Sequence, residues 1–344
     1  MAFDGFPLVV GWELTLACNL RCRHCASAAG MPRNQELTLA EALSICDQFP
    51  DLLVQEVNLT GGEPLVRPDW FQIAERLQRL QIWTQIVTNG MALDSDTIAR
   101  MKDVGIGAVG ISLDGLEATH DRIRGHEGLF KRVMAGMERV MAAGIPLSVL
   151  TAVNALNVHE LPSVFALLQS LGINTWQVQP LLPLGRATDN PELDLTEEIY
   201  LELAAFVQES LPKAKQAGFA LEPADGIGYC VEWLDVGDQR WGGCPAGMAA
   251  CGITSDGKVK GCLSMPSEPV EGDLRKQSFW SIWFSPDSFA YNRNFSPDDL
   301  GPACHGCDMG SRCKGGCSSM SYGSTGRFHN DPYCLLAIQR RSPG

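Results

Sequence analysis

The chain has 344 residues, of which 45% are hydrophobic and 19% are charged, and its formal net charge is −13 at pH 7. This composition is typical of a globular protein with a full core, and it excludes a disordered chain. The acidic balance argues against nucleic acid as a partner, because nucleic-acid-binding proteins usually carry a basic patch.

No apolar run approaches the length that spans a bilayer. The N-terminal sequence MAFDGFPLVVGWEL lacks the basic segment and the cleavage site of a signal peptide. We therefore expect a cytoplasmic protein without a membrane partner. Because disulfides are rare in that compartment, the thirteen cysteines are predicted to bind metal rather than to form cross-links.

Six short β-branched runs alternate with amphipathic helical patterns between residues 8 and 185. The runs lie at residues 8–16, 54–60, 82–89, 108–114, 146–153 and 175–181. Strand–helix units of this kind predict parallel strands with right-handed crossovers. Eight units would close a full barrel, so the predicted fold is α/β, a partial (β/α)6 TIM barrel with its active groups at the C-terminal strand ends.

Start and stop signals mark the helices between these strands. Thr38 and Glu41 have the spacing of a capping box, ahead of a helix whose apolar face includes Cys46. We therefore expect Cys46 to be a core residue. Glycines placed where helices should stop are Gly105, Gly144 and Gly172.

Three cysteines follow the first predicted strand in the stretch CNLRCRHC, at Cys18, Cys22 and Cys25. Three thiolates would hold three irons of a [4Fe–4S] cluster and leave one iron without a protein ligand. An open coordination position is the mark of a reactive metal site rather than a structural one. The alternative is a zinc knuckle whose fourth ligand is His24 or a distant residue.

The stretch LTGGEP, residues 59–64, follows the second strand. Its paired glycines allow a ligand to approach the backbone closely, and Glu63 offers a carboxylate to a cationic amine. The two motifs together resemble the radical S-adenosylmethionine (SAM) superfamily, whose signature is Cys-x3-Cys-x2-Cys followed by a GGEP-type motif. The resemblance implies that the three cysteines bind a [4Fe–4S] cluster and that SAM chelates its open iron.

The same resemblance implies the SAM contacts. His24 would lie against the adenine, and Gly62 and Glu63 would contact the methionyl amine. Ser112, in ISLDG at the end of the fourth strand, matches a position that commonly contacts SAM, and its alternative is a hydrogen bond to backbone. Arg124, in HDRIRG, would pair with the SAM carboxylate, and its alternative is a surface salt bridge.

Thr88, in VTNG, lies at a strand end that faces the same cavity and is a candidate substrate contact, although turn chemistry explains it nearly as well. No acidic or basic side chain has a spacing that identifies a general acid or base.

The predicted domains are a short N-terminal extension (residues 1–7), the barrel (8–185), a bridging helix and linker (186–240), a cysteine-rich domain (241–335) and a tail (336–344). The bridging helix, from about Asp194 to Ala217, is expected to lead out of the barrel. The cysteine-rich region is loop-rich and is expected to have a small core that metal binding stabilises.

The cysteines of this region resemble the seven-cysteine pattern of the SPASM domain, which in its family carries two auxiliary [4Fe–4S] clusters. By analogy the first auxiliary cluster would be held by Cys244, Cys251, Cys262 and Cys317. The second would be held by Cys304, Cys307, Cys313 and Cys334. If Cys251 is not a ligand, the first auxiliary cluster has an open iron. A zinc site in CHGCDMGSRCKGGC is the alternative, and Cys230 is predicted to be structural.

The resemblance implies an enzyme that cleaves SAM by one-electron reduction to a 5′-deoxyadenosyl radical, which abstracts hydrogen from a substrate. The C-terminal sequence is most similar to maturases of Nif11-type or nitrile-hydratase-type leader peptides, including stand-alone splicease subunits. The predicted function is therefore maturation of a ribosomally made (RiPP) precursor peptide, by backbone excision or by an oxidative cross-link. The alternatives are a small-molecule substrate such as a tetrapyrrole, a sulfatase-maturase-like oxidation of a protein side chain, or a non-enzymatic iron–sulfur or zinc scaffold.

The expected partners are the precursor peptide, an electron donor such as flavodoxin or ferredoxin, and a separate leader-binding protein. We expect the separate leader-binding protein because many related proteins carry an N-terminal leader-binding domain, whereas seven residues precede the first predicted strand here. We expect that protein to dock by adding a strand to an exposed sheet edge.

Overall fold

The computed structural model describes residues 5–224, 226–229, 242–265 and 269–341. Its centre is one curved ten-stranded sheet with the order β10-β9-β8-β1-β2-β3-β4-β5-β6-β7. The six predicted strands are all present and mutually parallel, which confirms the predicted fold class. They are β1 (Val9–Thr15), β2 (Glu56–Gly61), β3 (Trp83–Thr88), β4 (Ala108–Ser112), β5 (Leu147–Val153) and β6 (Thr175–Pro180).

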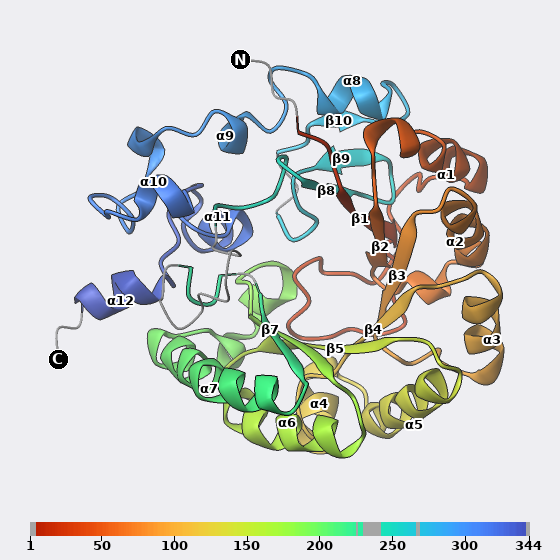
Figure 1. Cartoon of the computed structure of the whole chain (residues 1–344), viewed down its shortest axis with the longest axis horizontal. Coiled ribbons are helices and arrows are strands. Elements are labelled where there is room, and N and C mark those ends of the chain that lie inside the picture. The colour runs from red at the N-terminus through yellow and green to blue at the C-terminus, as the bar shows by residue number, and fades with distance from the viewer. Residues whose placement is uncertain (1–4, 225, 230–241, 266–268, 342–344) are drawn as a thin grey trace.

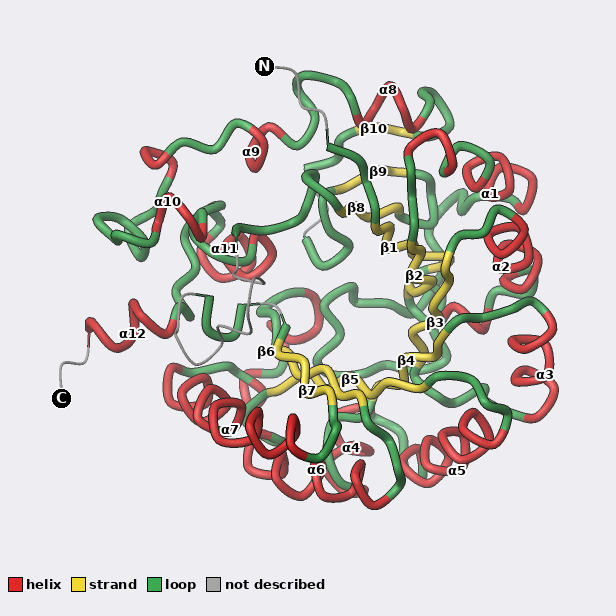
Figure 2. The backbone as a smooth tube through the Cα atoms, in the orientation of Figure 1, coloured by secondary structure: helices red, strands yellow, loops and turns green. Residues whose placement is uncertain are grey.

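Helices cover the outer, convex side of this sheet (Figures 1 and 2). They are α1 (Leu39–Cys46), α2 (Trp70–Arg79), α3 (Ser95–Asp103), α4 (Glu117–Arg124), α5 (Leu129–Ala142) and α6 (Leu161–Ser170). The apolar faces of these helices and of the strands form one core, in which Cys46 is fully buried, as predicted. Three predicted stop signals are also confirmed, because Gly105, Gly144 and Gly172 all have positive φ.

The helix that we expected to lead out of the barrel instead extends it. This helix, α7 (Glu197–Gln216), leads into β7 (Ala220–Pro223), which pairs in parallel with β6. The reason is its apolar face, because Phe206 of α7 makes an edge-on contact with Trp176 of β6 at a ring distance of 5.7 Å. The barrel therefore has a seventh strand beyond the predicted six.

The C-terminal region contributes three more strands at the opposite edge of the sheet. They are β8 (Ala250–Ile253), β9 (Lys258–Lys260) and β10 (Gly272–Asp273), and β8 pairs in parallel with β1. Beside them, α8 (Phe279–Trp283) contributes buried aromatic residues to the barrel core. This part of the cysteine-rich region thus shares the barrel's core, contrary to our expectation of a separate one.

Three C-terminal helices form a second, smaller core together with the start of α7. They are α10 (Gly310–Cys313), α11 (Ser318–Thr325) and α12 (Leu335–Arg341), and the short helix α9 (Ala290–Arg293) precedes them in the chain. The predicted tail therefore begins inside α12. The predicted boundary at residue 240 and the structural role predicted for Cys230 lie outside the described residues. In the described part of the chain, no helix combines the length and the apolar character needed to cross a bilayer.

The predicted capping box of α1 is present, and it provides a test of how this helix is held. The Glu41 amide donates to Thr38 Oγ1 at 3.3 Å, and the Thr38 amide donates to Glu41 Oε2 at 2.8 Å. Replacing Thr38 by Ala should lower the free energy of unfolding by about 1 kcal/mol, because a helix-terminal amide loses its acceptor. Denaturant unfolding of the anaerobic protein measures this change. Ser44→Ala, at an exposed position of the same helix, should leave the midpoint nearly unchanged, and equal losses in both variants would contradict the capping role.

Candidate active site

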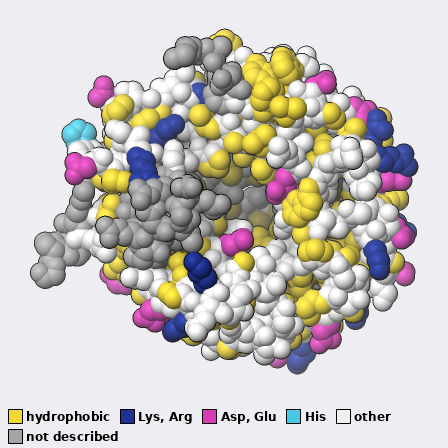
Figure 3. Space-filling view, viewed as in Figure 1, with side chains coloured by type: hydrophobic (Ala, Val, Ile, Leu, Met, Phe, Trp, Pro, Cys, Tyr) yellow, Lys and Arg dark blue, Asp and Glu magenta, His cyan; other side chains and the backbone are white. Residues whose placement is uncertain are grey.

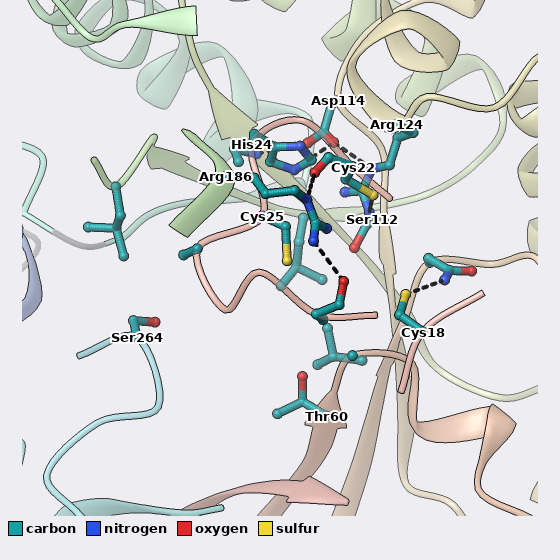
Figure 4. Close-up of a pocket in the computed structure, with 18 of the residues that line it drawn as sticks. Cys18, Cys22, His24, Cys25, Thr60, Ser112, Asp114, Arg124, Arg186 and Ser264 are labelled. Atoms are coloured by element: carbon teal, nitrogen blue, oxygen red, sulfur yellow. Dashed lines mark hydrogen bonds and ion pairs between the residues drawn. The ribbon is translucent and has the colours of Figure 1, made fainter. Parts of the chain in front are cut away.

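A cavity of about 250 Å3 lies at the C-terminal ends of the parallel strands. The cysteine loop after β1 borders it on one side, and the ends of β2, β3, β4 and β6 border it on the others (Figure 4). The polar residues that line it include Cys18, Cys22, His24, Cys25, Thr60, Thr88, Asn89, Ser112, Asp114, Arg124, Gln179, Arg186 and Ser264. The first three predicted cluster ligands therefore share one cavity, at the place that the barrel prediction indicated.

Hydrogen-bond donors approach the sulfurs of this loop. The Leu20 amide lies 3.4 Å from Cys18 Sγ and the Asn89 side-chain amide lies 3.9 Å from it. Arg124 Nη1 lies 4.0 Å from Cys22 Sγ. Burial raises the pKa of Cys22 to about 11, so this thiol needs a metal or another positive charge to become a thiolate. Hydrogen bonds to the ligand sulfurs are one of the features that set the reduction potential of an iron–sulfur cluster.

Each thiolate of a cubane cluster binds a different iron, so the three sulfurs need not meet at one point. Within the described ranges, no three His, Cys, Asp or Glu side chains converge as the ligands of a single ion would. The three thiols around a shared cavity, with donors aimed at two of them, fit a [4Fe–4S] cluster.

The segment after β6 holds the cysteine loop in place. Arg186 donates from Nε to the carbonyl of Cys22 and from Nη1 to that of Ala29, both at 2.8 Å. The preceding Gly185 has φ 58°, and a Cβ there would lie only 2.5 Å from the Cys25 carbonyl oxygen. Sequence reasoning missed Arg186, because nothing in its local sequence indicates a partner more than 150 residues away.

The GGEP loop packs against the backbone of the same cysteine loop. The Gly62 amide donates to the Thr15 carbonyl at 2.8 Å, and the Glu63 amide donates to the Ala17 carbonyl at 2.9 Å. A Cβ on Gly62 would lie 2.6 Å from the Leu16 carbonyl oxygen and closer still to that of Ala17. The glycine is therefore needed for the approach of two backbone segments, and Gly62 also lines the cavity.

Glu63 is not among the residues that line the cavity, and its expected contact with the methionyl amine stays a prediction. Glu63 is fully buried, and it accepts hydrogen bonds from the Thr88 hydroxyl and the Asn89 amide, both at 2.8 Å. Its carboxylate therefore binds the end of β3. Thr88 lines the cavity, but its hydroxyl proton is donated to Glu63, so turn chemistry explains this residue as well as substrate contact does.

A buried ionic network occupies the side of the cavity next to Cys22 (Figure 4). Arg124 donates from Nε to Asp114 Oδ2 at 2.6 Å, and His24 Nε2 lies 3.2 Å from the same oxygen. Asp114 is fully buried and Arg124 is 8% exposed, so the alternative of a surface salt bridge is wrong. Sequence reasoning missed Asp114, although it follows Ser112 by two residues in ISLDG.

Burial and neighbouring charges set the protonation states of this network. Burial alone would raise the pKa of Asp114, but Arg124 and His24 lower it to about 2. Burial lowers the pKa of His24 to about 4, so its imidazole is neutral at pH 7. Within the described residues, His24 Nδ1 is buried without a hydrogen-bond partner, and His24 lines the cavity. A neutral imidazole whose Nδ1 is available for a hydrogen bond fits the position predicted for His24, beside the adenine of SAM.

The auxiliary cysteines lie in two groups. Cys304, Cys313 and Cys334 are close enough that, after burial, the charges of Cys313 and Cys334 raise the pKa of Cys304, which reaches about 12. Cys307 joins this group through a turn in which its amide donates to the Cys304 carbonyl at 3.2 Å. Cys317 lies at the start of α11, in the same small core as Cys313 and Cys334.

In the other group, Cys244 and Cys262 both lie near the Tyr291 hydroxyl, whose pKa is raised by burial and by these two thiols. We expected Cys251 to complete the first auxiliary set, and this role stays a prediction; Arg293 lies near both Cys251 and Tyr291. Cys251 lies in β8, opposite Val10 of β1, and its buried side chain is part of the barrel core. The physical reason is strand pairing, because neighbouring residues in register on parallel strands project to the same face of a sheet.

The Asp114–Arg124 pair provides a test of what the buried network contributes. Replacing Asp114 by Asn leaves the Arg124 guanidinium buried without its counter-charge. We expect a loss of about 3 kcal/mol in the free energy of unfolding. Glu75→Gln breaks the exposed Glu75–Arg79 pair, whose side chains are 47% and 63% exposed, and should cost little. Anaerobic denaturant unfolding compares the two variants, and similar midpoints would show that the buried pair has no special role.

The Glu63 carboxyl predicts a dependence of stability on pH. Burial raises the pKa of Glu63 from its ordinary 4.5 to about 7, so the folded protein favours the protonated form. This group stabilises the fold below pH 4.5, and that contribution is lost as the pH rises through 7, with a total of about 3 kcal/mol. Unfolding midpoints between pH 5 and pH 8 should fall more steeply for the unmodified protein than for Glu63→Gln. Glu138→Gln, at an exposed position of α5, should keep the steep slope, and parallel slopes in all three proteins would refute the assignment.

Comparison with known proteins identifies two families in the chain. Residues 12–168 match the family described as "Radical SAM superfamily", and residues 244–308 match the "Iron-sulfur cluster-binding domain" named SPASM. The AdoMet-dependent heme synthase of Methanosarcina barkeri is 30% identical, and the match covers 97% of this chain and 98% of that protein. The mycofactocin maturase of Mycobacterium tuberculosis is also 30% identical, over 92% of this chain and 79% of that protein.

Solved structures of the same fold cover nearly the whole chain. Streptococcus suis SuiB bound to its precursor peptide SuiA has a TM-score of 0.77 at 17% identity, over 97% of this chain and 77% of that one. The structure of native anSMEcpe with bound AdoMet has the same TM-score and identity, over 97% of this chain and 95% of that one. The cysteine loop, the GGEP loop and the full-length relatives agree, and this chain therefore belongs to the radical SAM superfamily, with a C-terminal SPASM domain.

Proposed function

We propose that this chain is a radical SAM maturase that acts on a ribosomally made precursor peptide. The observation that carries the proposal is the chemistry of the cavity wall. Beyond the cysteines and the ionic network, the wall offers uncharged hydrogen-bonding groups at Thr60, Ser112, Gln179 and Ser264 and aliphatic groups at Leu150, Leu181 and Leu182. A peptide segment, with its amide donors and acceptors, matches such a surface.

The charges near the cavity support a peptide over a polyanionic substrate. Arg124 is paired with Asp114, and Arg186 donates to two backbone carbonyls, so both of these cavity-lining arginines already have protein partners. On the face shown in Figure 3, hydrophobic and acidic side chains border the central hollow. The whole chain carries a net charge of −13. A tetrapyrrole with several carboxylates would find both cavity-lining arginines already paired within the protein.

The proposed cofactor set is SAM with three [4Fe–4S] clusters, one of them held by the cysteine loop. When bound, these groups supply the one-electron chemistry that removes hydrogen from a substrate. His24 would pack on the adenine, and Gly62 and Glu63 would contact the methionyl amine. Ser112 and the remaining N–H groups of Arg124 would contact the polar part of SAM. The Asp114–Arg124 pair would fix that contact and exclude water from the side of the cavity next to Cys22.

The assignment as a peptide maturase also leads to proposals for its partners and for the overall reaction. A separate protein would bind the leader part of the peptide, and a flavodoxin or ferredoxin would donate electrons. The auxiliary clusters would accept an electron from the substrate, which makes the overall reaction an oxidation. Backbone excision and an oxidative cross-link are both compatible with this cavity.

A second candidate is the oxidation of a tetrapyrrole side chain. The observation that favours it is the full-length similarity to proteins named heme synthases, which include the relative from Methanosarcina barkeri. In this case Arg186 would have to exchange a carbonyl partner for a substrate carboxylate. Sulfatase-maturase-like oxidation of a protein side chain would use the cavity as the peptide proposal does.

The experiment uses the anaerobically purified protein with SAM and dithionite. We expect 5′-deoxyadenosine to form, and we expect Cys18→Ala to abolish it, because one iron ligand of the cluster is lost. Cys46→Ala, which removes a core thiol, should retain the activity. Absence of 5′-deoxyadenosine from the unmodified protein would refute radical SAM chemistry.

A separate co-expression experiment tests the substrate class. Small peptides encoded next to this chain's gene are co-expressed with it one at a time, and each is analysed by mass spectrometry. Loss of a residue-sized fragment indicates excision, and loss of hydrogen alone indicates a cross-link. Iron-coproporphyrin III is the competing probe, and its conversion in place of the peptide would establish the tetrapyrrole reaction and overturn the proposal.

A further inference from the structure

We propose that Asn89 raises the reduction potential of the cluster held by the cysteine loop, because its side-chain amide donates a hydrogen bond to the sulfur of Cys18. This inference rests on the cluster of the proposed function and deepens it. It gives a role to the turn after β3, residues 88–91, in which only Thr88 was a predicted site residue. Asn89 acts on the cluster through Cys18 and is therefore a positioning residue.

The orientation of the Asn89 side chain is fixed by its own turn. Asn89 Oδ1 accepts a hydrogen bond from the Met91 amide at 2.9 Å, which is the geometry of an Asx turn. If the side chain were flipped, its NH2 group would face the Met91 N–H, and two donors would oppose each other. The oxygen therefore faces the backbone of the turn, and the NH2 group faces the cysteine loop.

The two N–H groups of this amide have two separate acceptors. Asn89 Nδ2 lies 2.8 Å from Asn19 Oδ1 and 3.9 Å from Cys18 Sγ. One N–H bonds to the exposed Asn19, and the second is available for the sulfur, a contact that Figure 4 draws as a dashed line at Cys18. Asn89 is only 6% exposed, so little water competes for that N–H.

Buried groups hold the backbone of this turn. The Glu63 carboxylate, which is fully buried, accepts hydrogen bonds from the Asn89 amide and the Thr88 hydroxyl, both at 2.8 Å. Thr88 Oγ1 in turn accepts a hydrogen bond from the Gly90 amide at 3.1 Å. Gly90 has φ 81°, a conformation in which residues with a Cβ are strained. The turn therefore cannot move away from the cysteine loop without breaking these contacts.

A hydrogen-bond donor at this position favours the reduced cluster. Reduction adds one electron to the cluster, which increases the negative charge on its thiolate sulfurs. A hydrogen bond strengthens with the charge of its acceptor, so the Asn89 N–H stabilises the reduced form more than the oxidised form and raises the reduction potential. Arg124 Nη1, 4.0 Å from Cys22 Sγ, acts in the same direction on a second sulfur. The flavodoxin or ferredoxin of the proposed function would supply the electron.

The test is a redox titration of the anaerobically purified full chain with dithionite, followed by electron paramagnetic resonance without SAM. The signal component that is absent from Cys18→Ala identifies the cluster of the cysteine loop. Asn89→Ser keeps an oxygen that can accept the Met91 amide, but its side chain is too short to reach the sulfur. At a fixed applied potential we expect the ratio of reduced to oxidised cluster to fall about threefold, which is a lowering of about 28 mV for a one-electron couple.

Asn89→Asp is the second variant, because it keeps the shape of the side chain and the oxygen of the turn. It replaces the donor with a negatively charged oxygen next to Cys18, so we expect a larger fall than in Asn89→Ser. Iron analysis of each protein establishes that the cluster is present, and if Asn89→Ser loses iron, Asn89→Asp is the variant compared. Equal midpoints in the unmodified protein and in the loaded variants would overturn the proposal.

Asn154→Ser is the matched control. Asn154 is fully buried directly after β5, and its Oδ1 accepts a hydrogen bond from the Leu156 amide at 3.0 Å in the same kind of turn. Its Nδ2 donates to the Ala152 carbonyl rather than to a sulfur. We expect the midpoint of this variant to equal that of the unmodified protein, and an equal fall in both serine variants would overturn the proposal.

These measurements distinguish this inference from the proposed function. The titration uses neither SAM nor peptide, so a failure to modify a peptide leaves its result unchanged. A midpoint that does not move, in a protein that loses one signal component in Cys18→Ala, counts against the role of Asn89 alone. A Cys18→Ala protein that keeps every component would refute both the cluster assignment and this inference.

Discussion

The cysteine loop is fixed by backbone hydrogen bonds that continue the β1–β2 pairing past the ends of both strands. The amides of Gly62 and Glu63 donate to the carbonyls of Thr15 and Ala17, which brings the two loops into direct backbone contact. A side chain on Gly62 would collide with that backbone, so the glycine is a requirement of packing. The positions of the three thiols, and of everything that binds to them, depend on this contact.

Buried charge is the second constraint on the site. Buried thiols resist ionisation, and burial raises the pKa of the Cys22 thiol to about 11. Arg124 supplies a positive charge beside it, and Asp114 holds that guanidinium in the interior. The neutral His24 adds no competing charge at pH 7. The network therefore provides a positive edge for a cluster beside Cys22, and Arg186 carries a second positive charge at the cavity.

Local sequence signals predicted the structural features that residues close together in the chain determine. The six strands, the capping box at Thr38 and the cavity position of the three cysteines follow from periodicity and spacing. The partners of Arg186 and the seventh strand could not be predicted, because they depend on segments that are distant in the chain. Spacing did not predict that Cys251 lies in β8 with its side chain in the barrel core, because this position depends on the register of β8 on β1.

The central claim is that Cys18, Cys22 and Cys25 hold a [4Fe–4S] cluster and leave one of its irons open to SAM. Electron–nuclear double resonance tests it directly, on the reduced protein mixed with SAM labelled isotopically at the amino nitrogen and the carboxylate oxygen. The account predicts magnetic coupling from both labelled atoms to the cluster, because both atoms bind the open iron. A cluster signal with no coupling to either label would show that a fourth protein ligand closes that iron, and it would contradict the account.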